Sequence, residues 1–326
     1  MIGLTCTGKL LTTDYSNILG VPDPYNPLDL PPFTIRVKYA QGKNCTPHYK
    51  YGAYKVTVVD AEENILDVTT TDGGTDWTQL LWNEYYLLEV LGANTANITN
   101  MIQMFGGCYS LTSVALFNTS NVTSMNWMFS GCNALTTVPL FDTSNVTGMV
   151  GMFRECYALN TVPLFDTSNV TLMQGMFQNC SSLTTVPLFN TSNVTNMSNM
   201  FEYCTSLLSV PLFDMSKVTS TYQMFGDCTS LTSSPLFNLS NVIRMTYMFG
   251  TCTSLTSVPL FNTSSCTDME YMFLNCYNVE SGALALYQQA STQTTPPQKF
   301  TQAFRDCGSN TQSGAAELAQ IPNNWK

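Results

Sequence analysis

Cysteines are the residues of this chain best able to do chemistry, since a thiol can form a disulfide, bind a metal or act as a nucleophile. Eight of the 12 recur every 24 residues, each three positions after a Met-Phe pair: Cys108, Cys132, Cys156, Cys180, Cys204, Cys228, Cys252 and Cys276. No C-x-x-C pair occurs, which opposes a zinc site. Equivalent cysteines of stacked repeats would point in parallel about 4.8 Å apart, so bonding them would distort the stack. We predict a ladder of buried free thiols, with some disulfides as the alternative.

Four cysteines lie outside this series. Cys266 takes a slot that valine holds in six other repeats, so we expect it to act as a small apolar group. Cys307 repeats the Phe-x-x-Cys spacing near the C-terminal end. Whether Cys6 and Cys45 pair stays open.

The remaining candidates for catalysis or metal binding are few. His48, the single histidine, has no nucleophile partner and is predicted to be packed or solvated rather than a catalytic base. Asp142, Asp166 and Asp214 share one slot of the repeat with asparagines. A calcium ladder would need a carboxylate in every coil, so we expect these side chains to cap the following turn. The sequence therefore predicts no enzyme, no cofactor and no metal site.

The elements that position these residues are 24-residue repeats. The pattern Leu111-x-x-Val114-x-Leu116 matches the strand segment of leucine-rich repeats, and Val122 to Phe129 has the spacing of one helical or 3-10 turn. Thr119 and its equivalents could donate to the neighbouring backbone as a ladder, which Met215 and Leu239 interrupt. We predict an α/β-type repeat solenoid, leucine-rich-repeat-like, with short parallel strands plus helical or 3-10 turns. Prolines such as Pro139 should keep the strand side two or three residues wide and irregular.

The chain divides into three predicted regions. Residues 1–75 show the period-two alternation of strands, as in Phe33 to Tyr39 and Tyr54 to Val58, and form a small β-rich N-terminal domain through which the chain could oligomerise. Residues 76–282 are the solenoid, whose first unit is degenerate, as expected of a cap. Residues 283–326 form a C-terminal cap containing an insertion of about seven residues.

Charge and hydropathy limit which classes of partner we expect. Charged residues make up 10% of the chain, with a formal net charge of −10. Residues 101–282 contain only three basic side chains, so we expect neither nucleic acid nor an anionic membrane as a partner. No apolar run is long enough for membrane insertion, and no secretory signal is recognisable.

Variable slots are the candidates for recognition, because packing constrains the others. Between the two methionines of each repeat, three units place aromatic residues, and the slot after cysteine holds further tyrosines. These rings could stack on sugars or a partner protein, or could simply cover the turn below. The candidate binding surface comprises Trp127, Tyr247, Tyr271, Tyr109, Tyr157 and Tyr277.

One further indication comes from a resemblance. Leu140 to Thr147, followed by Met149 and Met152-Phe153-x-x-Cys156, is similar to the repeats of BspA-type leucine-rich-repeat surface proteins, in the form found in phage tail-associated proteins. The resemblance covers about residues 76–282. It implies adhesion or receptor recognition of a host-cell surface glycan or protein, on a phage virion or an extracellular surface. A structural spacer or assembly component is the alternative.

Overall fold

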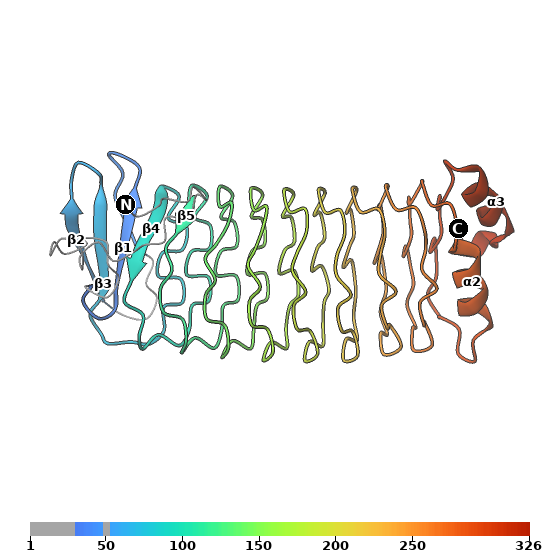
Figure 1. The fold of residues 1–326 in the computed structure, drawn as a ribbon, viewed down its shortest axis with the longest axis horizontal. Coiled ribbons are helices and arrows are strands. Elements are labelled where there is room, and N and C mark those ends of the chain that lie inside the picture. Colours follow the sequence, from blue (N-terminus) through green and yellow to red (C-terminus); the bar gives the residue numbers. More distant parts are fainter. Residues whose placement is uncertain (1–29, 48–52) are drawn as a thin grey trace, which may run out of the picture.

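Each 24-residue unit folds into one coil because its apolar slots all point inwards. In the unit of Val122, the side chains of Met125, Met128, Phe129 and Cys132 are fully buried. The computed structural model describes residues 30–47 and 53–326, so His48 and Cys6 lie outside the described residues. Figure 1 shows the coils stacked side by side in a nearly straight array. The repeat solenoid predicted from the sequence is confirmed.

Phenylalanine rings form a column through the whole stack. The ring of each Met-Phe pair stacks on the equivalent ring of the next coil, with centroids 5.2 to 5.8 Å apart from Phe105 to Phe304. A second set of rings packs against this column, as Phe141 does against Phe129 at 6.1 Å. Since every ring touches only its own and adjacent coils, the stability of the array is close to a sum of neighbour terms.

The predicted helical or 3-10 turn between Val122 and Phe129 is wrong. Successive turns occupy this segment, as when the Met128 N–H donates to the Met125 carbonyl at 3.2 Å. Trp127 has a φ of 54°, a left-handed conformation that interrupts any helix. Alternate N–H groups then point to the next coil, so Phe129 donates to the Met152 carbonyl at 2.9 Å. This side therefore carries most of the hydrogen bonds between coils.

The predicted strand side is even narrower than expected. Only β5 (Ser113–Val114) forms there, parallel to β4 (Leu87–Ala93) of the first coil. In several later coils a single bond remains, such as Asn160 N–H to the Thr136 carbonyl at 3.2 Å, and near the C-terminal end Ser257 and Ser281 form an isolated parallel bridge. Later coils have proline, as at Pro139, in the slot of Ala115, whose N–H donates to the Val90 carbonyl. Because proline has no N–H, this hydrogen bond between coils is lost.

A threonine ladder links the coils at a third position, as predicted. The hydroxyls of Thr119, Thr143, Thr167 and Thr191 are buried, and each donates to a carbonyl of the next coil at 2.8 Å. Met215 and Leu239 interrupt the series with buried apolar side chains.

We predict that Thr167→Val costs about 1–2 kcal/mol, because the Asn190 carbonyl loses its donor. Urea unfolding at neutral pH measures this change. Thr171→Val is the matched control, since Thr171 is exposed and its hydroxyl bond is 3.4 Å long. Equal losses for the two variants would contradict a structural role for the buried ladder.

The N-terminal strands continue into the solenoid. The sheet has the order β2-β3-β1-β4-β5, where β1 is Thr34–Tyr39, β2 is Tyr54–Asp60 and β3 is Ile65–Thr70. The strands expected from Phe33 to Tyr39 and from Tyr54 to Val58 are thus present. Strand β1 pairs antiparallel with both β3 and β4, and their buried side chains join one core. Packing is therefore continuous across the boundary predicted after residue 75.

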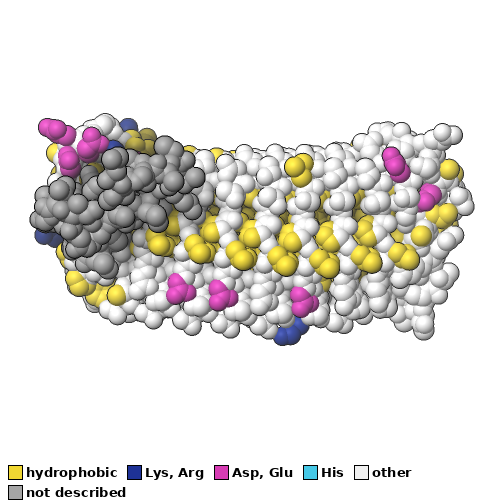
Figure 2. Space-filling view, in the orientation of Figure 1, with side chains coloured by type: hydrophobic (Ala, Val, Ile, Leu, Met, Phe, Trp, Pro, Cys, Tyr) yellow, Lys and Arg dark blue, Asp and Glu magenta, His cyan; other side chains and the backbone are white. Residues whose placement is uncertain are grey.

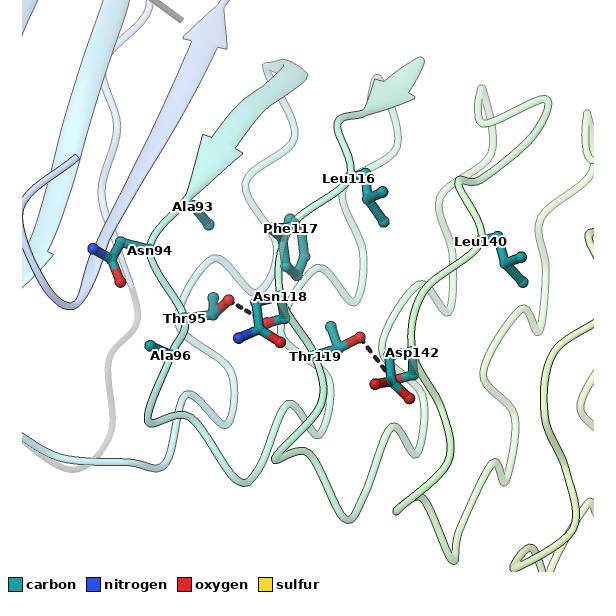
Figure 3. Close-up of a pocket in the computed structure, with 10 residues that line it drawn as sticks. All are labelled: Ala93, Asn94, Thr95, Ala96, Leu116, Phe117, Asn118, Thr119, Leu140 and Asp142. Atoms are coloured by element: carbon teal, nitrogen blue, oxygen red, sulfur yellow. Dashed lines mark hydrogen bonds between the residues drawn. The ribbon is translucent and has the colours of Figure 1, made fainter. Parts of the chain in front are cut away.

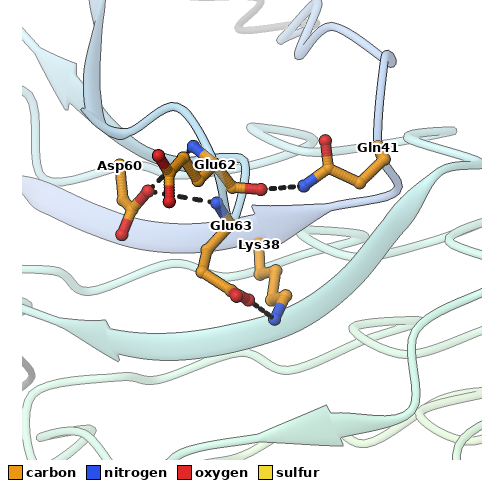
Figure 4. A network of polar contacts seen from close by, with 5 residues as sticks. All are labelled: Lys38, Gln41, Asp60, Glu62 and Glu63. Carbon is orange, nitrogen blue, oxygen red and sulfur yellow. Dashed lines mark hydrogen bonds and ion pairs between the residues drawn. The ribbon is translucent and has the colours of Figure 1, made fainter.

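The turn between β2 and β3 is held by polar contacts (Figure 4). The Asp60 carboxylate accepts the N–H groups of Glu62 and Glu63, at 2.9 and 3.0 Å. Lys38 of β1 forms an ion pair with Glu63, and the Gln41 amide donates to the Glu62 carbonyl. These contacts attach the turn to its neighbouring strand.

The C-terminal end of the stack is closed by helices. Helix α2 (Ala283–Thr292) occupies the inserted segment, followed by α3 (Gln312–Gln320) and the 3-10 turn η2 (Asn323–Trp325). The Phe304 ring continues the phenylalanine column at 5.8 Å from Phe273, and Trp325 stacks on Phe300 at 4.3 Å. The last coil is therefore covered rather than left open (Figure 1).

Candidate binding face

Seven leucines, one in each successive coil, project into solvent. We call them the leucine row: Leu116, Leu140, Leu164, Leu188, Leu212, Leu236 and Leu260, with 55–63% of each side chain exposed. Leu116 is the last apolar residue of the strand pattern that begins at Leu111, yet its side chain faces solvent. In the next coil the Phe141 N–H donates to the Pro139 carbonyl at 3.0 Å, which closes a three-residue turn around Leu140. Val138 and Phe141 then both point inward, so the residue of the turn between them points out.

The leucine row forms a continuous apolar band on one face of the molecule, visible in Figure 2. A leucine about 60% exposed presents on the order of 100 Å², so seven present roughly 700 Å², more than the largest apolar patch of most monomers. The exposed slots beside it hold neutral side chains such as Thr136 and Thr137. An apolar band of this size on a polar, weakly charged surface is typical of an interaction site.

An acidic edge runs beside the leucine row. Asp142, Asp166 and Asp214 are exposed two positions after a row leucine, and the carboxylate of Asp142 accepts the Ser144 hydroxyl at 2.7 Å and its N–H at 3.0 Å. These serine hydrogen bonds lower the pKa of all three carboxyl groups. The predicted capping role is confirmed, and the edge is ionised at neutral pH.

A hollow opens at the N-terminal end of the row (Figure 3). The first coil has Gly92 and Ala93 where the second has Leu116 and Phe117, so two large side chains are missing. The space encloses about 530 Å³ and is lined by Leu116, Leu140 and Phe117 with polar residues of the Asn and Thr slots. The band therefore ends in a depression able to receive an apolar side chain.

The predicted aromatic residues do not gather into one surface. Trp127 is 36% exposed, and its ring lies over Gly151, where an added Cβ would come within 2.4 Å of the ring. Tyr247 is half-buried and its hydroxyl is 2.7 Å from that of Thr251. Tyr271 is half-buried and lies one coil after Tyr247. Trp127 and Tyr247 are five coil steps apart. The geometry of Trp127 and Tyr247 fits rings that cover neighbouring turns, while their role in binding stays a prediction.

The tyrosines after the cysteines are more accessible. Tyr109 and Tyr157 are 48% and 44% exposed, whereas Tyr277 is half-buried. Tyr109 stacks on Tyr85 with centroids 5.1 Å apart, and Tyr85 and Tyr86 are themselves nearly half-exposed. Sequence reasoning missed Tyr85 because the first coil departs from the repeat.

The cysteine ladder is buried as predicted. All eight thiols have no exposed surface, and each donates to a carbonyl of the preceding coil at 3.0 to 3.2 Å, as Cys132 does to Phe105. Burial raises the pKa of each of these thiols, and that of Cys266 to about 12. A buried, protonated thiol is a poor nucleophile. The burial and hydrogen bonds of these cysteines therefore indicate a structural role for the ladder.

Within residues 30–47 and 53–326, no group of three or more His, Cys, Asp or Glu side chains could hold a metal ion. No helix in this part of the chain has the length and apolar character needed to cross a membrane. The leucine row with its acidic edge and terminal hollow is thus the best-formed candidate site in the described structure.

One protein-family model matches the repeats of this chain. The model described as "Mycoplasma protein of unknown function, DUF285" matches residues 84–184, 136–236, 161–258, 186–287 and 209–313. These overlapping matches cover more than half of the chain, so the protein belongs to this family of repeat proteins. The comparison with curated proteins found no match.

Several solved structures are similar in part. A leucine-rich repeat protein from Eubacterium ventriosum has 18% identity and a TM-score of 0.41, covering 58% of this chain. This chain spans 62% of the length of that protein. The leucine-rich repeat protein of T. pallidum has 19% identity and a TM-score of 0.38, covering 54% of this chain and 80% of its own. An internalin from Listeria monocytogenes has 12% identity and a TM-score of 0.29, covering 69% and 76%.

Proposed function

We propose that this protein is a non-catalytic binding module that engages a partner protein through the leucine row. The observation that carries the proposal is the exposure of one leucine in each of seven successive coils. Leaving so much apolar surface in water is unfavourable by about 25 cal/mol per Å², and covering it with a partner recovers that free energy. The surrounding polar slots then restrict where the partner sits.

The setting we propose is adhesion or receptor recognition on a phage virion or an extracellular surface. The support for this setting is the resemblance of the repeats to BspA-type surface proteins. A structural spacer is the second candidate, and the nearly straight stack of coils in Figure 1 favours it. A spacer needs no exposed leucine row, however, so the presence of the row favours a binding module over a spacer.

Glycan recognition is a further candidate, supported by the exposed tyrosines of the first coils. Tyr85 and Tyr86 lie close to residues 42–46, where Lys43 is 4.4 Å from the Tyr86 ring centroid, and Tyr109 stacks on Tyr85. A space of about 450 Å³ there is lined by Tyr85, Tyr86, Asn44 and Asn83. Aromatic rings beside amide groups suit a sugar, whose face is apolar and whose edge is polar.

Peptide selection tests the leading proposal without knowledge of the natural partner. We expect immobilised protein to enrich binders from a random displayed peptide library. Binding of the enriched peptides should weaken about tenfold or more in the Leu164→Asn/Leu188→Asn variant, because both residues lie at the centre of the row. Binding is measured by fluorescence anisotropy, and folding of the variant by thermal unfolding.

Matched variants make the result interpretable. Ile243→Asn makes a similar change at a residue that is 49% exposed and lies outside the row, and it should leave peptide binding unchanged. If no enriched peptide depends on the row, the proposal fails. A glycan array screened in parallel, with Tyr85→Ala as the control variant, then decides whether the tyrosines carry recognition instead.

A further inference from the structure

We propose that the partner of the leucine row is a basic amphipathic α-helix that lies along the solenoid axis. This inference rests on the proposed function and names the kind of partner that the face accepts. Three features of the face carry it: the spacing of the leucines, the length of the row and the acidic edge.

The leucine spacing nearly matches the pitch of a helix. Parallel backbone bridges join Ser124 to Gly148 and the equivalent residues along the stack, so adjacent coils lie about 4.8 Å apart. An α-helix advances 5.4 Å per turn and presents apolar side chains once per turn on one face. The difference accumulates to about 1.8 Å over three steps, less than half a spacing. Four consecutive leucines can therefore interdigitate with the apolar stripe of one helix.

The length of the row suits the same partner. Seven leucines extend over six coil steps, or roughly 29 Å, which is the length of about 19 helical residues. The exposed leucine area, on the order of 700 Å², is close to what one partner contributes to a standard protein interface. The hollow beside Leu116 could receive a terminal apolar side chain of the helix.

Charge selects a basic helix. Asp142, Asp166 and Asp214 line one edge of the row, and Lys217 beside Asp214 is the basic residue near it, with its Nζ 2.7 Å from Asn193 Oδ1. Lysine or arginine along the flank of a helix would meet these carboxylates. A second copy of the chain would bring the same acidic edge and a formal net charge of −10, so repulsion opposes self-association through this face.

The test uses the whole protein and a synthetic 18-residue peptide with leucine once per helical turn, lysine on one flank and alanine elsewhere. Fluorescence anisotropy should show binding at least about tenfold tighter than that of an equally helical peptide in which the leucines are scattered around the helix. The Leu164→Asn/Leu188→Asn variant should lose about tenfold or more of the affinity. Changing the peptide lysines to glutamate, or using Asp142→Asn/Asp166→Asn protein, should weaken binding at low salt.

Each alternative partner of the leucine row predicts a different experimental result. Equal affinity for the scattered-leucine peptide would overturn the helix, and equal affinity for the glutamate peptide would overturn the basic flank. Sedimentation showing a dimer that the leucine variant dissolves would assign the row to a second copy instead. If library peptides bind the row but none is basic and helical, the inference fails while the proposed function stands. If nothing binds the row, both fail.

Discussion

Removal of residues 152–175 is expected to leave a folded, shorter protein with a modestly lower unfolding midpoint. The deletion takes out one whole 24-residue coil and joins Gly151 to Met176, which occupies the slot of Met152. Phe177 can then stack on Phe129, and Cys180 can donate to the Phe129 carbonyl as Cys156 now does. Only one set of neighbour contacts is lost, because contacts in a solenoid are made between adjacent coils. Circular dichroism and urea unfolding measure the outcome.

A half-unit deletion provides the control. Removing residues 152–163 joins Gly151 to Leu164, so one coil loses the buried Phe153, Cys156 and Leu159 and becomes too short to close. The inward and outward slots of that coil no longer align with those of its neighbours. We expect loss of cooperative unfolding. If both deletions gave the same stability, the additive account of the stack would be wrong.

Stability is expected to fall steeply as the pH rises above 9. Burial raises the folded-state pKa of all eight ladder thiols above their ordinary value of 9.0. Thiols of the unfolded chain ionise near pH 9 while those of the folded chain stay protonated. The contribution to stability is therefore complete below pH 9 and decreases above it. At pH 10 each thiol favours unfolding by about 1.4 kcal/mol, on the order of 10 kcal/mol for the ladder.

Urea unfolding between pH 8 and pH 10, with reductant present, measures this dependence. Cys180→Ala together with Cys204→Ala should reduce the slope by about a quarter of the ladder's contribution, since two of eight titrating groups are removed. A flat profile in the unsubstituted protein would show that the thiols are either accessible or already ionised in the folded state. Titration of the denatured protein without reductant should find most ladder thiols free.

The sequence determined the features that packing repeats in every coil. A period of 24 residues, a buried Met-Phe pair and a cysteine three positions later require that equivalent residues share one environment, so the solenoid and the buried thiols could be predicted. The threonine ladder and the aspartate caps could also be predicted, because a short polar side chain bonds the backbone close to it. The phage setting and the ligand stay predictions, since neither depends on packing.

Tertiary structure alone decided which apolar side chains face water. Residues two positions apart in a strand point to the same face, as Val114 and Leu116 would. In the structure, however, Val114 is buried and Leu116 is 56% exposed. The apolar pattern assigns both to one face. In five later coils, as at Pro139, a three-residue turn between the proline carbonyl and the phenylalanine N–H points the leucine outward. Trp127 and Tyr247 depend on their neighbours in the same way: each occupies a variable slot, and each ring lies against a nearby glycine, while the role of both in binding stays a prediction. Composition and period state which residues recur, whereas exposure depends on backbone direction and on the side chains of the adjacent coils.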